Sequence, residues 1–88
     1  MEVKGYTIRS TSEEGIYYLV NGWDKHRAFW VKEKHIDKAI FKTAGQAKAS
    51  LTKLLKVMDE YRTNIFELVA VSESGEISTL MHRALFTF

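Results

Sequence analysis

The N-terminal quarter of the chain alternates apolar and polar positions with the period of a β-strand. In residues 3–10, apolar Tyr6 and Ile8 alternate with polar neighbours, which predicts a half-buried strand. Residues 11–15 (TSEEG) supply turn formers, and residues 16–22 (IYYLVNG) resume with β-branched and aromatic side chains. The sequence therefore predicts an antiparallel hairpin at the start of the chain.

Two segments compete for the next strand. Asn21-Gly22 is a strong hairpin signal, because both residue types tolerate the left-handed conformation that a type I′ turn requires. Such a turn places a third strand within residues 27–33 (RAFWVKE). The alternative is a loop across 21–37 that leads to a strand at residues 38–42 (KAIFK). We expect strands at both places.

An amphipathic helix is predicted between about residues 44 and 61. Thr43 and Gln46 have the spacing of a capping box, in which the threonine hydroxyl accepts a hydrogen bond from the third helical amide. Apolar residues then recur at helical spacing along one stripe, which comprises Ala47, Leu51, Leu54, Leu55 and Met58. We expect this stripe to be buried against a sheet.

The C-terminal third begins with a strongly apolar segment. Residues 64–71 (NIFELVAV) predict a strand that is apolar on both faces, which is typical of a central position in a sheet. Phe66, Leu68 and Ala70 are expected on one face, and Ile65, Val69 and Val71 on the other. Gly75 then predicts a turn, and residues 77–88 are compatible with either a final strand or a helical tail.

These elements predict an α+β fold, arranged as a two-layer sandwich. The sheet would be antiparallel or mixed, with three to five strands, and would carry the single helix on one face. A chain of 88 residues is long enough for one small domain, here residues 1–88. Its 45% hydrophobic and 27% charged residues are typical of an ordinary globular protein.

Composition argues against several kinds of chemistry. The chain has no cysteine, so disulfides, thiolate catalysis and sulfur-rich zinc sites are excluded. His26, His35 and His82 form no helical i, i+4 pair, and we interpret them as isolated surface side chains without a metal ion. Asp24 lies two residues from His26, but no motif fixes a nucleophile, an acid and base pair or a phosphate-binding loop. We therefore expect no enzyme activity and no cofactor.

The sequence predicts a cytoplasmic protein. The N-terminus MEVKGYTIRS lacks the apolar region of a secretory signal. The apolar stretches are also shorter than the about 20 residues that a membrane-spanning helix needs. We expect no contact with a membrane.

Charge is distributed unevenly along the chain. Residues 24–56 contain nine Lys and Arg against Asp24, Glu33 and Asp37, a local charge of +6. Residues 1–23 sum to −1 and residues 57–88 to −3. The basic middle of the chain is therefore the candidate region for an acidic partner.

The same region is rich in the residue types that dominate binding energy at protein interfaces. Tyr, Trp and Arg concentrate between residues 17 and 30, and the neighbours 17/18 and 29/30 point to opposite faces if they lie in strands. One ring of each pair is then expected to face outward. Trp23 or Trp30 would be the apolar anchor, Arg27 would give directional hydrogen bonds, and the lysines would steer the partner. The predicted contacts are Tyr18, Trp23, Lys25, Arg27, Trp30, Lys32 and Lys34.

Four alternatives remain open. The same lysines could neutralise phosphates while the rings stack on bases, which makes a small nucleic-acid-binding protein the second hypothesis. A lysine-rich edge strand has a similar composition, since lysines there prevent unwanted strand pairing. One tryptophan could belong to the core, with the apolar tail shielding the other. The chain could also self-associate through an edge strand or through this tail.

Three segments together resemble a known group of proteins. YTIRSTSEEGIYYLVNGW, IFKTAGQAKASLTKLLKVMDEY and FELVAVSESGE resemble a family of short uncharacterised proteins encoded by temperate phages of staphylococci. The likeness covers about residues 3–76, and the final LMHRALFTF departs from it. The resemblance implies a phage-encoded accessory protein in the bacterial cytoplasm that binds a host or mobile-element protein without chemistry of its own.

Overall fold

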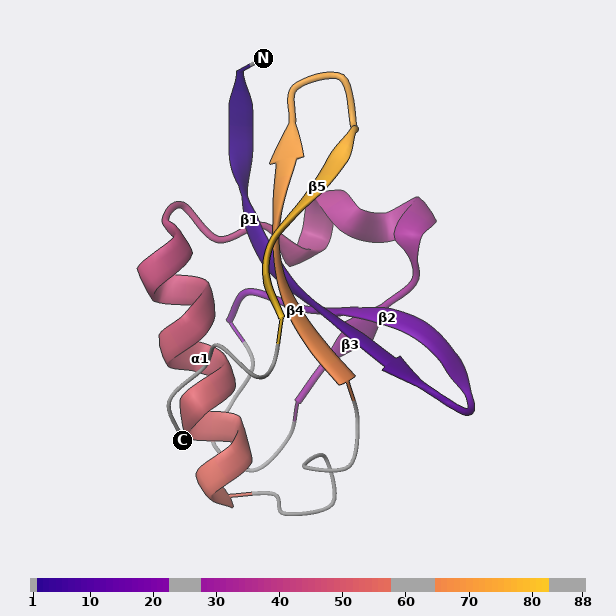
Figure 1. Ribbon diagram of the computed structural model, residues 1–88, viewed down its shortest axis with the longest axis vertical. Coiled ribbons are helices and arrows are strands. Elements are labelled where there is room, and N and C mark those ends of the chain that lie inside the picture. The colour runs from indigo at the N-terminus through magenta and orange to yellow at the C-terminus, as the bar shows by residue number, and fades with distance from the viewer. Residues whose placement is uncertain (1, 23–27, 58–64, 83–88) are drawn as a thin grey trace.

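The computed structural model describes residues 2–22, 28–57 and 65–82, and these residues form a five-stranded antiparallel sheet with two helices (Figure 1). The order of strands across the sheet is β3-β2-β1-β4-β5. The predicted α+β class is confirmed. The elements are β1 (Val3–Ser12), β2 (Gly15–Leu19), β3 (Trp30–Val31), the 3-10 helix η1 (Glu33–Ala39), α1 (Ala44–Val57), β4 (Ile65–Ser72) and β5 (Ile77–His82).

The N-terminal hairpin forms as predicted. Ser12 pairs with Gly15, so β1 and β2 are joined by a tight turn, and the φ of +132° at Gly15 explains the glycine there. On its other side β1 pairs antiparallel with β4, with Ile8 opposite Leu68. The first strand of the chain is thus the central strand of the sheet.

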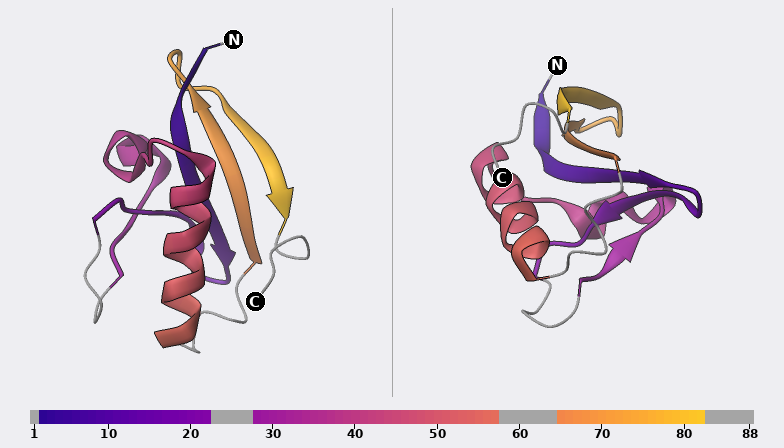
Figure 2. Two further views of the ribbon diagram at one scale, coloured as in Figure 1. Left: turned by 90° about the vertical axis from the view of Figure 1, so that its left-hand side faces the viewer. Right: turned by 60° about the horizontal axis from the view of Figure 1, so that its bottom comes forward.

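Helix α1 covers one face of this sheet (Figure 2). Leu51 and Leu54 are fully buried, and they belong to one cluster with Ile8 of β1, Leu19 of β2 and Phe66 of β4. The apolar stripe of the helix is therefore the centre of the core, as its spacing predicted. The helix was predicted to extend to about residue 61, but residues 58–61 lie outside the described residues.

The side-chain hydroxyl group of Thr43 caps the N-terminus of α1. The backbone amide of Gln46 donates to Thr43 Oγ1 at 3.1 Å, which confirms the first half of the predicted capping box. Replacing Thr43 with Ala should lower the free energy of unfolding by about 1 kcal/mol, since this amide loses its acceptor. Urea denaturation would measure the loss, and Thr43→Ser, which keeps the hydroxyl, should restore most of it.

The second face of the sheet is partly covered by η1, an element that the sequence pattern did not predict. Ile36 and Ala39 pack with Tyr18 and Val69 on the face opposite α1. Their spacing of three matches the about three residues per turn of a 3-10 helix, so both side chains point inward together. The predicted strand at 38–42 is therefore wrong, because Lys38 and Ala39 end this helix.

After η1, a single residue, Phe41, pairs with β1. The backbone amide of Tyr6 donates to the carbonyl of Phe41 at 2.9 Å, and the amide of Phe41 donates back to Tyr6 at 2.7 Å. This bridge lies on the part of β1 that extends past the end of β2. It fixes the chain immediately before α1 begins.

The connection from β2 to β3 also differs from the prediction. Strand β3 pairs antiparallel with β2, as expected, but it covers only Trp30–Val31. Gly22 has a φ of +91°, whereas Asn21 does not have a positive φ, so the two residues do not form a type I′ turn. The side chain of Asn21 instead donates from Nδ2 to the carbonyl of Ile40 at 2.9 Å, which ties this connection to the chain before α1.

The C-terminal pair of strands completes the sheet. Strand β4 lies between β1 and β5, and Phe66, Leu68, Val69, Ala70 and Val71 are buried, which confirms the predicted internal strand. Ile65, at its start, is 57% exposed. Gly75 has a positive φ in the turn that follows, and residues 77–82 continue as β5. Residues 83–88 of the predicted strand or tail lie outside the described part of the chain.

Candidate partner-binding surface

The predicted contact residues fall into two groups in the structure. Tyr18, Trp30, Lys32 and Lys34 are placed, whereas Trp23, Lys25 and Arg27 lie outside the described residues. Tyr18 is 2% exposed and belongs to the core between the sheet and η1. This burial corrects its assignment to the contact surface, because a ring in the core offers nothing to a partner.

In each of the two neighbouring aromatic pairs, one ring is more exposed than the other. Tyr17 is half-buried while Tyr18 is buried, and Phe29 is 43% exposed while Trp30 packs against the core. The Trp30 ring stacks on Phe66 with centroids 6.3 Å apart and an angle of 24° between the planes. Trp30 is thus a ring at the edge of the core, and Phe29 is the exposed one.

The hydroxyl of Tyr18 belongs to a polar network on the face opposite α1. Burial raises the pKa of Tyr18 above its usual 10.0, while a hydrogen bond with Arg9 acts in the opposite direction. Arg9 also donates from Nε to Glu67 at 3.0 Å and from a terminal nitrogen to Thr79 at 2.7 Å. Arg9 therefore links its own strand, β1, to β2, β4 and β5, and we interpret this network as structural.

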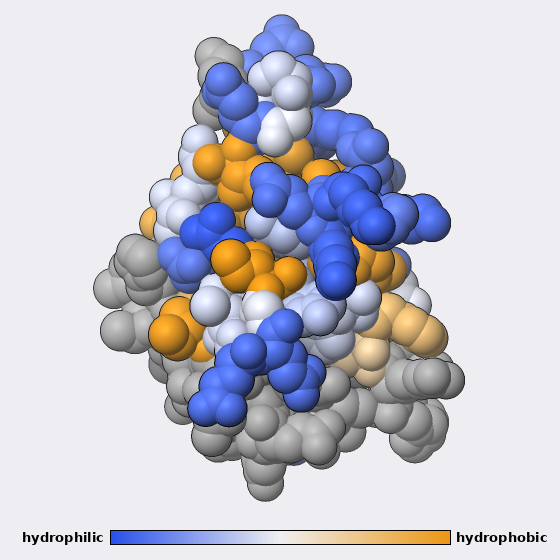
Figure 3. All heavy atoms as spheres, turned by 90° about the vertical axis from the view of Figure 1, so that its right-hand side faces the viewer, coloured by the Kyte–Doolittle hydropathy of each residue, from blue (hydrophilic) through white to orange (hydrophobic). Residues whose placement is uncertain are grey.

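Exposed apolar side chains on this face include two isoleucines near the β1–β2 turn. Ile16 and Ile65 are 52% and 57% exposed, and both lie opposite Thr11 in the register of the sheet. Seen from the side away from α1, apolar side chains are separated by polar ones (Figure 3). Scattered exposed apolar side chains are normal on a protein surface.

The lysines around η1 are exposed, but they alternate with acidic residues. Lys32 precedes the helix, and Lys34 and Lys38 project from it, beside Glu33 and Asp37. Asp37 pairs with Lys4 of β1, so one acidic group of this segment serves to attach η1 to the sheet. Because acidic residues lie between these lysines, the surface around η1 attracts anions less strongly than the charge of +6 for residues 24–56 suggested.

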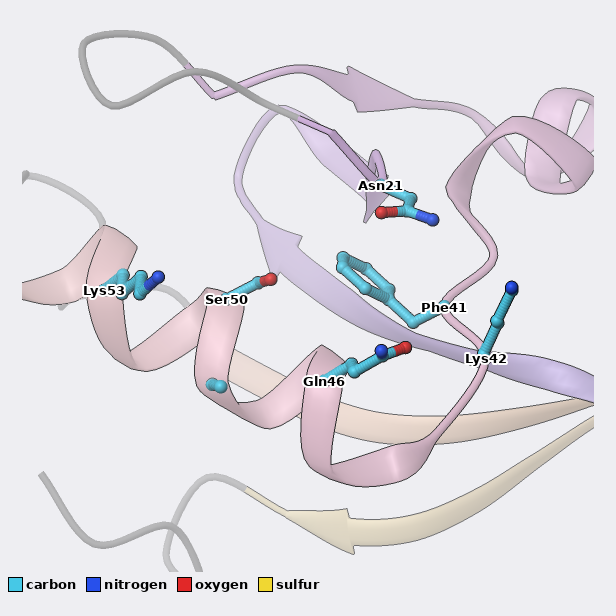
Figure 4. A pocket seen from close by; sticks show the side chains of 7 residues that line it. Asn21, Phe41, Lys42, Gln46, Ser50 and Lys53 are labelled. Carbon is cyan, nitrogen blue, oxygen red and sulfur yellow. The ribbon is translucent and has the colours of Figure 1, made fainter.

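A groove that the sequence did not predict lies beside α1 (Figure 4). Its volume is about 430 Å³. Three separate parts of the chain line it, namely Asn21 after β2, Phe41 and Lys42 before α1, and Gln46, Ala49, Ser50 and Lys53 on α1. In Figure 4 the Phe41 ring lies between Asn21 and the helix, and Lys42 and Lys53 lie towards opposite ends of the groove.

Hydrogen bonds already described hold the walls of this groove. The backbone of Phe41 is fixed by Tyr6, the Asn21 amide is fixed by Ile40, and the start of α1 is fixed by Thr43. A binding site whose walls are held in place loses little conformational entropy when a ligand enters.

The electrostatics of the groove are one-sided. Its lining contains two lysines and no Asp or Glu. Lys42 and Lys53 are both exposed, and neither forms an ion pair with another described residue. The sequence holds one signal of this, since residues 38–56 contain five lysines and no acidic residue.

Metal binding finds no support within residues 2–22, 28–57 and 65–82. No three His, Asp or Glu side chains of these residues come together as a metal site. The helices of the same residues include none that is long and apolar enough to cross a membrane.

Comparison of the chain with protein-family models, with curated proteins and with solved structures gives no match.

Proposed function

We propose that the protein is a non-enzymatic accessory protein that binds an acidic surface of a host or mobile-element protein. The contact surface comprises Phe29, Lys32 and Lys34, together with the predicted contacts Trp23, Lys25 and Arg27. The resemblance to staphylococcal phage proteins suggests the class of partner and the bacterial cytoplasm as the place of action. The charge of the surface suggests an acidic partner.

One observation carries this proposal, namely that the exposed lysines differ from the cations that serve the fold. Lys4 pairs with Asp37, and Arg9 pairs with Glu67 at 2.9 Å, so both attach one element to another. Lys32 and Lys34, by contrast, are exposed and form no ion pair with a described residue. Unpaired surface cations accelerate the encounter with an acidic partner and disfavour basic ones.

Phe29 supplies the apolar part of the surface. Its carbonyl accepts a hydrogen bond from the amide of Val20 at 2.8 Å, which holds the backbone while the ring remains 43% exposed. Phe29 and Asn21 lie close to the two described ends of the segment that contains Trp23, Lys25 and Arg27. An aromatic ring among cations is a common arrangement at binding hot spots, because the ring gains energy by leaving water.

The geometry favours a protein partner over nucleic acid. Stacking on bases needs open aromatic faces. Among the placed rings of the candidate region, Trp30 stacks on Phe66, Tyr18 is buried, and Phe41 is 3% exposed. Phe29, by contrast, is exposed. A single exposed ring suits one apolar anchor better than a row of stacked bases.

Affinity purification tests the proposal. The tagged full chain would be incubated with a staphylococcal lysate at physiological salt, and bound proteins would be identified by mass spectrometry. Recovery of a specific partner should fall about tenfold for the double variant Lys32→Glu/Lys34→Glu, and by a similar factor for Phe29→Ala. Trp23→Ala and Arg27→Ala should also reduce recovery, and circular dichroism should confirm that each variant is folded.

The matched control is Lys38→Glu/Lys56→Glu, which changes the net charge by the same amount at exposed positions outside the proposed surface. It should retain most of the recovery. Equal loss in both double variants would contradict the assignment of the surface. Saturable binding to DNA or RNA without a protein partner would instead support the nucleic-acid alternative.

A further inference from the structure

The groove beside α1 is distinct from the surface formed by Phe29, Lys32 and Lys34. Its two lysines come from different elements, Lys42 from the segment before α1 and Lys53 from the third turn of the helix. Gln46 and Ser50 lie between them on the same helix face, because residues four apart are neighbours on a helix surface. The result is a line of polar donors with a cation towards each end.

We propose that this groove binds an acidic segment of a protein, with carboxylates placed at Lys42 and Lys53. The inference rests on the proposed function, because it names the chemistry of the partner segment. Two lysines with no acidic group in the lining create a site that is favourable for anions and unfavourable for cations. Carboxylates of the partner would form ion pairs with Lys42 and Lys53, which form none with the described residues.

The polar groups between the lysines fit a peptide. Gln46 can donate and accept a hydrogen bond through its amide, and Ser50 can do both through its hydroxyl, so both match the alternating donors and acceptors of a peptide backbone. Figure 4 shows the Ser50 hydroxyl directed towards the groove. Ala49 adds a methyl group rather than a bulky side chain, which leaves room for close approach of the chain.

Phosphate is less well served by this site. Strong phosphate sites use free amides at a helix N-terminus or the fork of an arginine. Here the amide of Gln46 already donates to Thr43, and the groove contains no arginine. The Phe41 ring is 3% exposed and offers no face on which a base could stack.

An NMR titration of the full chain with an oligoglutamate peptide tests the proposal. The backbone amides of Lys42, Gln46, Ala49, Ser50 and Lys53 should shift together and saturate at low salt. Lys53→Ala should weaken this binding about fivefold, because one of the two cations of the groove is lost. Ala49→Trp should abolish it without changing the charge, because the indole fills the groove.

Lys56→Ala is the matched control, because Lys56 is also an exposed lysine of α1 but does not line the groove. Its affinity for the peptide should stay within about twofold of the wild type. Equal weakening by Lys53→Ala and Lys56→Ala would show unspecific attraction and overturn the inference. Tighter saturable binding of oligothymidylate or inorganic phosphate in the groove would overturn it in favour of phosphate.

A different experiment would contradict the proposed function. If the proposed function is wrong, partner recovery will be unaffected by the Lys32 and Lys34 variants. The amide shifts of Lys42, Gln46, Ala49, Ser50 and Lys53 report on the groove, which neither Lys32 nor Lys34 lines. Saturation of the groove by the peptide, together with selective loss in Lys53→Ala, would support the groove even if the other surface were wrong.

Discussion

The Leu51→Asp variant is expected to be unfolded at room temperature. Leu51 has no exposed surface and packs in the cluster that joins α1 to β1 and β4. Removing a buried leucine side chain costs about 2 to 5 kcal/mol, and placing a carboxyl group there without a partner adds several more. A domain of this size is stable by only about 5 to 10 kcal/mol. Far-ultraviolet circular dichroism and the spread of amide resonances would show the loss of structure.

Lys53→Asp provides the comparison, because it introduces the same side chain on the same helix at an exposed position. It should remain folded and lose about 1 kcal/mol or less, which is mainly the lower helix propensity of Asp. A cooperative thermal transition in Leu51→Asp close to that of the wild type would mean that this side of α1 is not the core.

Local periodicity accounts for most of the fold that the sequence predicted. The β1–β2 hairpin needs only alternation and a turn residue, and α1 needs only a cap and a stripe, so each is specified within about 20 residues. Strand β4 was recognisable as internal because it is apolar on both faces. These elements form as predicted because the secondary structure that each local pattern favours is also the one that packs in the fold.

The segment between β3 and α1 was predicted wrongly because two periods compete there. Ile36 and Ala39 are three residues apart, which favours a 3-10 turn, whereas Ile40 and Phe41 have strong β propensity. In the structure both preferences are used in succession. The 3-10 helix ends at Ala39, and Phe41 then pairs with Tyr6 across 35 positions of the sequence, a contact that no local pattern contains.

The candidate site was predictable only in part for the same reason. The concentration of lysines and rings was visible in the sequence, and alternation indicated that one ring of each pair would turn outward. Which ring it was depended on the side that η1 and α1 cover, so Tyr18 and Trp30 could not be assigned beforehand. The groove brings together Asn21, Phe41 and Lys53, and it exists only once the helix has packed.

Gly5→Ala is expected to lower the free energy of unfolding by about 1 to 3 kcal/mol, although alanine is ordinarily tolerated in strands. A Cβ atom at this position would overlap with Ile40 Cγ2 and would lie 2.7 Å from the carbonyl oxygen of Phe41. The second contact is with backbone, so relief requires the segment before α1 to move away from β1. That movement would strain the bridge between Tyr6 and Phe41. Chemical denaturation would measure the loss of stability.

The effect should reach the groove, because Phe41 and Lys42 form one of its walls. In Gly5→Ala the amide resonances of these residues should shift, and the affinity for oligoglutamate should fall. Gly45→Ala is the matched control, since a Cβ there meets only Thr43 Oγ1 at an ordinary 3.9 Å within a helix. It should raise stability by up to about 1 kcal/mol, because alanine favours the helix. Equal stability of the two variants would contradict the close contact between β1 and the segment at Phe41, and with it the fixed wall on which the groove depends.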